Sequence, residues 1–198
     1  MDDAELLERI HGGDPDALNQ LIERHYDSIC RYCYWKTGNA AMAQDLTQET
    51  FYRFFRSLDR YTHTGKCRAY LYTIARRLAS NARKDLSQVG LDQIAESALG
   101  TAPSAEETAE RVWQSRELVR WLAHLPDELQ EAVILRYSYG LRFREISAIT
   151  GVNLYTAQYR VKRGLAALKK IIQKEETDDE EPEKPAARPS PASPCSRP

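Results

Sequence analysis

Apolar residues recur at spacings of three and four along almost the whole chain, and this feature constrains the fold more than any other. In the first clear case, Leu18, Ile22, Tyr26 and Ile29 fall on one face of a helix. The alternation of apolar and polar residues that is typical of strands is almost absent, and glycine is scarce except at expected helix ends. The pattern predicts an all-α protein.

The N-terminal part is predicted to hold three main helices that share a core, after a shorter leading helix. The first starts at the N-cap Asp14, which a proline follows, and ends at Gly38. The second covers about residues 40–60 and the third about residues 68–84.

Helix signals and charge divide the chain into four segments. Residues 1–85 are expected to form a first helical domain and residues 86–103 an acidic linker. A second helical domain, 104–174, begins with a capping-box spacing at Ser104. The last segment, 175–198, is polar and proline-rich and is expected to be a disordered tail.

Several classes of protein are disfavoured by what the sequence lacks. No apolar run reaches the length of a membrane span, roughly 18–20 residues. The chain opens with acidic residues rather than with the basic and apolar segments of a signal peptide. We therefore expect a cytoplasmic protein without membrane insertion. No glycine-rich phosphate loop or catalytic constellation is recognisable, so we expect no enzyme, no cofactor and no metal site.

The most specific motif is the segment FREISAITGVNLYTAQYRVKRGLAALKKI, which predicts a short helix, a tight turn at Gly151 and a longer basic helix. Ser147 is small enough for the close approach of the two helices, and a glycine four positions later permits the turn. The expected buried stripe consists of Ile146, Ile149, Val152, Ala157, Val161, Leu165 and Leu168. The opposite, polar and basic face suits base edges and phosphates of duplex DNA. The alternative is a solvated basic helix in a plain bundle.

Aromatic residues and cations are mixed between Phe51 and Lys84. Phe51, Phe54, Phe55 and Leu58 have core spacing, so we expect them to be buried. The remaining aromatic residues are interleaved with cations: Tyr61, His63, Tyr70 and Tyr72. Flat rings beside positive charge are what single-stranded nucleic acid requires. The alternative is that these tyrosines pack internally beneath a solvated basic face.

Two stretches carry a family resemblance. AQDLTQETFYRFFRSLDRY followed by CRAYLYTIARRLASNARK resembles region 2 of bacterial RNA polymerase sigma factors of the sigma-70 family. LPDELQEAVILRYSYGLRFREISAITGVNLYTAQYRVKRGLAALKK resembles region 4. With only these two regions and a short linker, the chain is similar to the extracytoplasmic-function (ECF) group. The resemblance implies an alternative sigma factor that directs promoter-specific transcription initiation, with core RNA polymerase, promoter DNA and an anti-sigma factor as partners.

The resemblance also implies roles for individual residues. The surface expected to bind polymerase consists of Asp45, Gln48, Glu49 and Arg53. The residues expected at the minus-ten element are Tyr61, His63, Lys66, Arg68, Tyr70, Arg76, Arg77 and Arg83. Those expected at the minus-thirty-five element are Asn153, Tyr155, Thr156, Gln158, Tyr159, Arg160, Lys162 and Arg163.

Two alternatives stay open at this point. A stand-alone helix-turn-helix repressor or activator would use the C-terminal motif and treat the first domain as a dimerisation or sensing module. Cys30 and Cys33, with His25 nearby, have a spacing found in zinc and redox sites, although a buried structural role is favoured for them.

Overall fold

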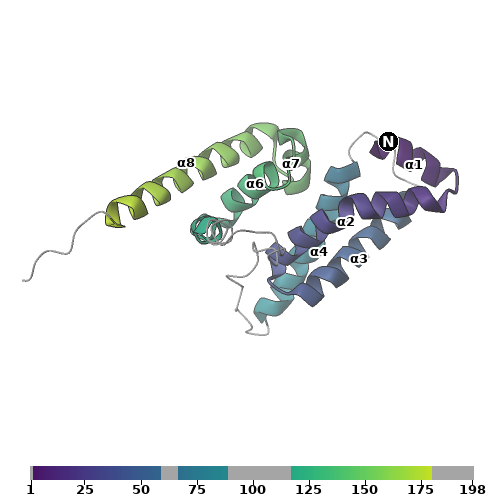
Figure 1. Cartoon of the computed structure of the whole chain (residues 1–198), viewed down its shortest axis with the longest axis horizontal. Coiled ribbons are helices and arrows are strands. Elements are labelled where there is room, and N and C mark those ends of the chain that lie inside the picture. The colour runs from purple at the N-terminus through teal and green to yellow at the C-terminus, as the bar shows by residue number, and fades with distance from the viewer. Residues whose placement is uncertain (1, 59–66, 89–116, 180–198) are drawn as a thin grey trace, which may run out of the picture.

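The computed structural model describes residues 2–58, 67–88 and 117–179, and the elements in these ranges are α-helices apart from one 3₁₀ residue at Leu58. This confirms the all-α prediction. Figure 1 shows the helices in two groups, an N-terminal half (residues 2–88) and a C-terminal half (residues 117–179), which lie against each other. None of the described helices is long and apolar enough to cross a lipid bilayer.

The described residues of the N-terminal half form a helical bundle of α1 (Asp3–His11), α2 (Pro15–Thr37), α3 (Ala40–Ser57) and α4 (Cys67–Gln88). Helices α2, α3 and α4 pack pairwise on one another, and α1 packs on α2 (Figure 1). The expected end of the second helix near residue 60 and the start of a helix at Ser104 lie outside the described residues.

Local signals set the ends of α2 as the sequence predicts. The side chain of Asp14 accepts hydrogen bonds from the backbone N–H groups of Asp16 and Ala17, which satisfies donors that the first helical turn leaves free. Gly38 ends the helix with a left-handed backbone, φ 66°, which favours glycine because it has no Cβ. Both helix ends therefore follow from residues that are neighbours in sequence.

The C-terminal half contains a helical stretch over residues 117–123, then α6 (Asp127–Tyr137), α7 (Phe143–Thr150) and α8 (Leu154–Asp179). Helix α7, the turn at Gly151 (φ 73°) and α8 form the predicted helix-turn-helix. The hydroxyl of Ser147 donates to the carbonyl oxygen of Val152 at 2.6 Å, so this small residue also ties the turn to α7.

The buried stripe of α8 differs from the expected one at a single position. Ala157, Val161 and Leu168 are buried as expected, but Leu165 is exposed. Gly164 takes the inward position because α6 lies too close for a side chain there. The helical periodicity of 3.6 residues allows either position 164 or position 165 to face the core, and the short distance between α8 and α6 selects the glycine.

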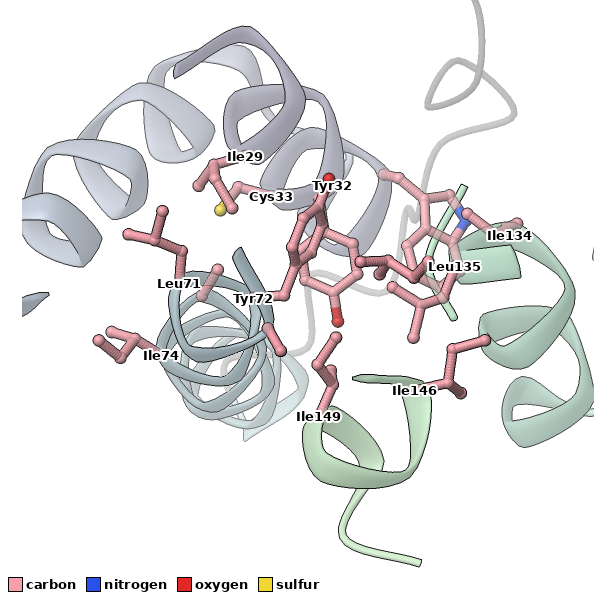
Figure 2. Close-up of a cluster of buried hydrophobic side chains, with 14 of the residues drawn as sticks. Ile29, Tyr32, Cys33, Leu71, Tyr72, Ile74, Ile134, Leu135, Ile146 and Ile149 are labelled. Atoms are coloured by element: carbon pink, nitrogen blue, oxygen red, sulfur yellow. The ribbon is translucent and has the colours of Figure 1, made fainter. Parts of the chain in front are cut away.

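The two halves share one hydrophobic core. Figure 2 shows Tyr32 of α2 and Tyr72 of α4 beside residues of α6 and α7, among them Leu135 and Ile149. Tyr139, which follows α6, has its ring centroid 5.3 Å from that of Tyr72 and 6.0 Å from that of Tyr32. The contact between the halves therefore buries large aromatic rings, which is a substantial source of association free energy.

Candidate nucleic-acid interface

The predicted polymerase-binding surface is one open face of α3. Asp45, Gln48 and Arg53 are exposed and Glu49 is half-buried, whereas Phe51 and other residues of the opposite face are in the core. Glu49 Oε1 accepts a hydrogen bond from Arg53 Nε at 2.6 Å, as residues four apart on a helix can. The four side chains thus form a continuous polar face of α3, three of them charged.

The cations predicted for the minus-ten element largely face the other half of the molecule. Three of the described arginines pair with carboxylates of the C-terminal half. Arg68 Nη2 lies 3.3 Å from Glu145 Oε2, Arg76 Nε lies 3.1 Å from Glu131 Oε2, and Arg83 Nη1 lies 3.0 Å from Asp127 Oδ2.

Arg77 differs from these three arginines: in the described part of α4 its side chain is exposed to solvent. Tyr61, His63 and Lys66 lie outside the described residues.

The two described tyrosines of this segment are not free aromatic faces. Tyr70 is half-buried, with its ring centroid 5.9 Å from that of Phe54. Tyr72 is 1% exposed and meets Tyr32 edge to face, with centroids 5.3 Å apart. The expectation that Tyr72 stacks on unpaired bases is therefore wrong for this arrangement: its position on α4 points into the core between the halves (Figure 2).

Glu131 is the centre of the polar contact between the halves, and it was not among the predicted residues. Its carboxylate is buried, and it accepts hydrogen bonds from the Tyr32 hydroxyl at 2.8 Å and from Arg76 Nε. Lys36 Nζ lies 2.8 Å from the same Oε1 atom. One carboxylate of α6 thereby holds three donors from α2 and α4.

Burial alone would raise the pKa of Glu131, but the ammonium of Lys36, the guanidinium of Arg76 and the Tyr32 hydroxyl outweigh it. The pKa therefore lies below its ordinary value, and Glu131 is a carboxylate at neutral pH. A sequence signal for this residue does exist: it directly precedes the apolar run from Ala132 to Leu135, so a charge there must find partners or stay unburied.

A cavity of about 1110 Å³ opens between the halves, and Tyr72 and Tyr139 are among the residues that line it. Its lining includes five arginines from both halves: Arg24, Arg31, Arg68, Arg142 and Arg144. The acidic residues of the lining are Asp3 and Glu145. The positive charges of the two halves repel one another across this space, which opposes the closed arrangement. The ion pairs of Glu131, Glu145 and Asp127 offset that repulsion.

The recognition helix α8 presents most of its predicted contacts to solvent. Tyr155 and Tyr159 are 79% and 50% exposed, and Lys162 and Arg163 are also exposed. The hydroxyl of Tyr159 accepts a hydrogen bond from Arg163 Nη1 at 3.1 Å. Aromatic and cationic groups therefore form one outward face near the start of the helix.

The other predicted residues of α8 have local roles as well. Asn153 is the N-cap of the helix, and its Oδ1 accepts from the backbone N–H of Thr156 at 2.8 Å. Arg160 donates to a carboxylate oxygen of Glu128 on α6. Gln158 is half-buried.

In the described part of the chain, Cys30 and Cys33 do not belong to a group of three or more metal-ligating side chains. Both are free thiols, Cys33 is in the core, and burial raises its pKa to about 12. His25, the nearby candidate ligand, turns instead to Asp3, with 3.1 Å between Nε2 and Oδ2. A buried structural role is therefore supported for Cys33.

Comparison with protein families finds two matches in one chain. Residues 21–88 match the family model described as Sigma-70 region 2, and residues 115–168 match the one described as Sigma-70, region 4. Both matched ranges lie where the sequence resemblance places them.

Curated proteins give the same result. The chain is 34% identical over 171 residues to the ECF RNA polymerase sigma factor BldN of Streptomyces coelicolor, covering 83% of this chain but only 64% of the relative's length. It is 30% identical over 166 residues to the RNA polymerase sigma factor CarQ of Myxococcus xanthus, covering 84% of this chain and 95% of that one.

Among solved structures, the sigma factor RpoE of Bartonella quintana, in complex with the anti-sigma factor NepR, superposes with a TM-score of 0.62. The identity is 21%, and the match covers 78% of this chain and 96% of that one. At this identity the likeness shows that the fold is shared.

Proposed function

This chain belongs to the ECF group of sigma-70 family RNA polymerase sigma factors, and on that premise we propose that it binds core RNA polymerase and directs it to promoters. The observation that carries the proposal is the presence in one chain of a charged, open face on α3 and an exposed recognition face on α8. The chemistry of bond formation would belong to the polymerase. The protein would thus act as a specificity subunit rather than as an enzyme.

Each surface has one proposed role. The face of Asp45, Gln48, Glu49 and Arg53 binds polymerase. Residues 61–84, with the arginines of α4, bind the minus-ten element as it opens, where cations neutralise the phosphates. The face of α8 around Tyr155 and Lys162 reads the minus-thirty-five element in the major groove.

These roles require the two halves to separate on a promoter. The two elements lie about 25 base pairs apart, which is about 85 Å at 3.4 Å per base pair. The halves contact each other in the structure, and Arg68, Arg76 and Arg83 are paired with carboxylates rather than with phosphates. Residues 89–116 are long enough to bridge the gap, because 28 residues span up to about 95 Å when fully extended.

The closed arrangement is therefore proposed to be the state of the free protein in the cytoplasm. An anti-sigma factor, as in the complex of the Bartonella protein, would be the partner that keeps the sigma factor from polymerase. Charged surfaces on α3 and α8 are the parts that such a partner would need to cover.

The function is tested by transcription with purified core polymerase on fragmented source DNA, with and without this protein. We expect new discrete transcript starts that share two upstream motifs. Absence of new starts, together with tight binding of the protein alone to duplex DNA, would favour a stand-alone repressor or activator instead.

Charge reversal on α3 should abolish the activity without unfolding the protein. We expect Asp45→Lys to weaken binding to core polymerase at least about tenfold, because it puts an ammonium where the proposed interface has a carboxylate, and mismatched charge in an interface costs several kcal/mol. Co-purification with core and the yield of the new transcripts measure the effect.

The matched control is Asp27→Lys, which makes the same charge change at an exposed position of α2. Both variants should keep the wild-type melting temperature. If the two variants lose polymerase binding equally, the assigned face of α3 is wrong.

A further inference from the structure

Three side chains with metal-binding atoms meet where α1, α2 and α4 come together. They are Asp3 at the start of α1, His25 in the middle of α2 and Cys67 at the start of α4. One donor atom from each, a carboxylate oxygen, an imidazole nitrogen and a thiol sulfur, lies within 4.8 Å of the other two. The cluster is formed only by folding, since these residues have no common sequence motif.

The surroundings of the cluster suit a bound ion. His25 is 6% exposed and Cys67 is 2% exposed, so two of the three donors are shielded from solvent. Donors bound to a tetrahedral ion at 2.0–2.3 Å lie roughly 3.4 Å apart. The Nε2 atom of His25 and the Oδ2 atom of Asp3 are already 3.1 Å apart, so a contraction of at most about 1.4 Å on the side of Cys67, from 4.8 Å or less, would complete the geometry.

Neighbouring groups also favour the binding of a metal ion by this cluster. Arg24 Nη1 donates to Asp3 Oδ1 at 2.9 Å, which orients the carboxylate and leaves Oδ2 directed at His25. Such outer contacts fix the direction of metal ligands in known sites. Asp3 and His25 also line the cavity between the halves, which offers room for a water molecule as a fourth ligand.

The donor set selects among metals. One sulfur, one nitrogen and one oxygen donor are the combination that zinc accepts, whereas magnesium and calcium take oxygen donors. We propose that Asp3, His25 and Cys67 bind one zinc ion, which fastens α1 and the first turn of α4 to α2.

The position of the ion gives it a role beyond stability. Cys67 is the first residue of α4 and directly follows residues 59–66, which include Tyr61, His63 and Lys66 of the proposed minus-ten surface. Metal binding would fix the point at which this DNA-binding segment joins the helix. This role rests on the minus-ten function proposed above for that segment.

Cobalt(II) is the probe for the full-length protein after treatment with a chelator. We expect one Co²⁺ per chain, with the visible bands of a tetrahedral ion and a thiolate-to-cobalt charge-transfer band in the near ultraviolet. Zn²⁺ should displace the cobalt and raise the melting temperature of the wild type.

Two variants test the ligands, and one variant is the control. Cys67→Ser should remove the charge-transfer band, and Asp3→Asn, at a half-buried position that folding tolerates more readily, should weaken binding at least about tenfold. Cys30→Ser, which removes a thiol outside the cluster, should leave the spectrum unchanged.

A charge-transfer band that persists in Cys67→Ser, or wild-type affinity in Asp3→Asn, would overturn the assignment. So would a cobalt spectrum without a thiolate band in the wild type. None of these readouts depends on transcription, so failure of the metal site and failure of the proposed function are separate results.

Discussion

Replacing Glu131 with glutamine will open the contact between the two halves and raise the affinity of the free protein for promoter DNA at least about tenfold. The carboxylate is buried and holds Tyr32, Lys36 and Arg76. Removing one partner of a buried ion pair costs about 3–5 kcal/mol, because the remaining charge stays buried without its counterion. Each 1.4 kcal/mol is a factor of ten in the closed-to-open ratio, so even a partial loss exposes Arg76 to DNA.

Two measurements would detect the separation of the two halves. Small-angle scattering should give a larger radius of gyration for Glu131→Gln, and fluorescence anisotropy with a mapped promoter fragment should give tighter binding. Tyr32→Phe removes one hydrogen bond and no charge, so it should weaken the contact between the halves by only about 1 kcal/mol. The radius of gyration and the DNA affinity should therefore change in the same direction as in Glu131→Gln, but by less.

Glu128→Gln is the matched control for the scattering experiment. It makes the same change on α6, but Glu128 is exposed and pairs with Arg160 inside the C-terminal half. Its radius of gyration should equal that of the wild type. A Glu131→Gln protein that is as compact as the wild type and binds DNA no better would show that the carboxylate of Glu131 does not hold the halves together.

Acid should produce the same opening in the wild type. The pKa of Glu131 in the folded protein lies below its ordinary value of 4.5, since Lys36, Arg76 and Tyr32 together outweigh the effect of burial. A lowered folded pKa gives stability that is fully present above the unfolded pKa and is lost as the pH falls through the folded pKa. The radius of gyration should therefore rise as the pH falls below 4.5.

The comparison with Glu131→Gln assigns this acid transition. The ion pairs of Glu145 and Asp127 also cross the contact, and the wild type and Glu131→Gln share them. The difference between the two pH profiles belongs to residue 131. Identical profiles would contradict the role given to its carboxylate.

Features that depend on neighbours in sequence were predictable. The N-cap at Asp14, the left-handed Gly38 and the turn at Gly151 each follow from side chains or backbone freedom within one or two helical turns. The open face of α3 was also predictable, because the phenylalanines that define its core side fix the phase of the helix.

Features that depend on the contact between the halves were not predictable. Tyr32 and Glu131 are 99 positions apart, and no local rule says that one will donate to the other. The burial of Tyr72 and the pairing of Arg68 with Glu145 also result from the contact between the halves. Residues that were predicted to meet DNA therefore lie in that contact. The meeting of Asp3, His25 and Cys67 likewise requires three helices to be assembled.

The packing of α8 on α6 should be sensitive to substitution of Gly164. A Cβ atom there would lie 2.6 Å from Val133 Cγ2 and 3.2 Å from the backbone oxygen of Leu129, both on α6. Overpacking of this kind costs about 1–3 kcal/mol. We expect Gly164→Ala to destabilise the C-terminal half by about 1–2 kcal/mol and Gly164→Val by about 3 kcal/mol, measured by urea denaturation.

A second substitution reverses the sign of this effect if the close contact is its cause. In a Val133→Ala background the Cγ2 atom is gone, and alanine is a better helix former than glycine by about 1 kcal/mol. Gly164→Ala should then be neutral or stabilising relative to Val133→Ala alone. Leu165→Ala, at the exposed neighbouring position, should change the free energy of unfolding little in either background. Equal losses from Gly164→Ala in both backgrounds would place the constraint at the Leu129 carbonyl, because that is the contact which Val133→Ala leaves in place.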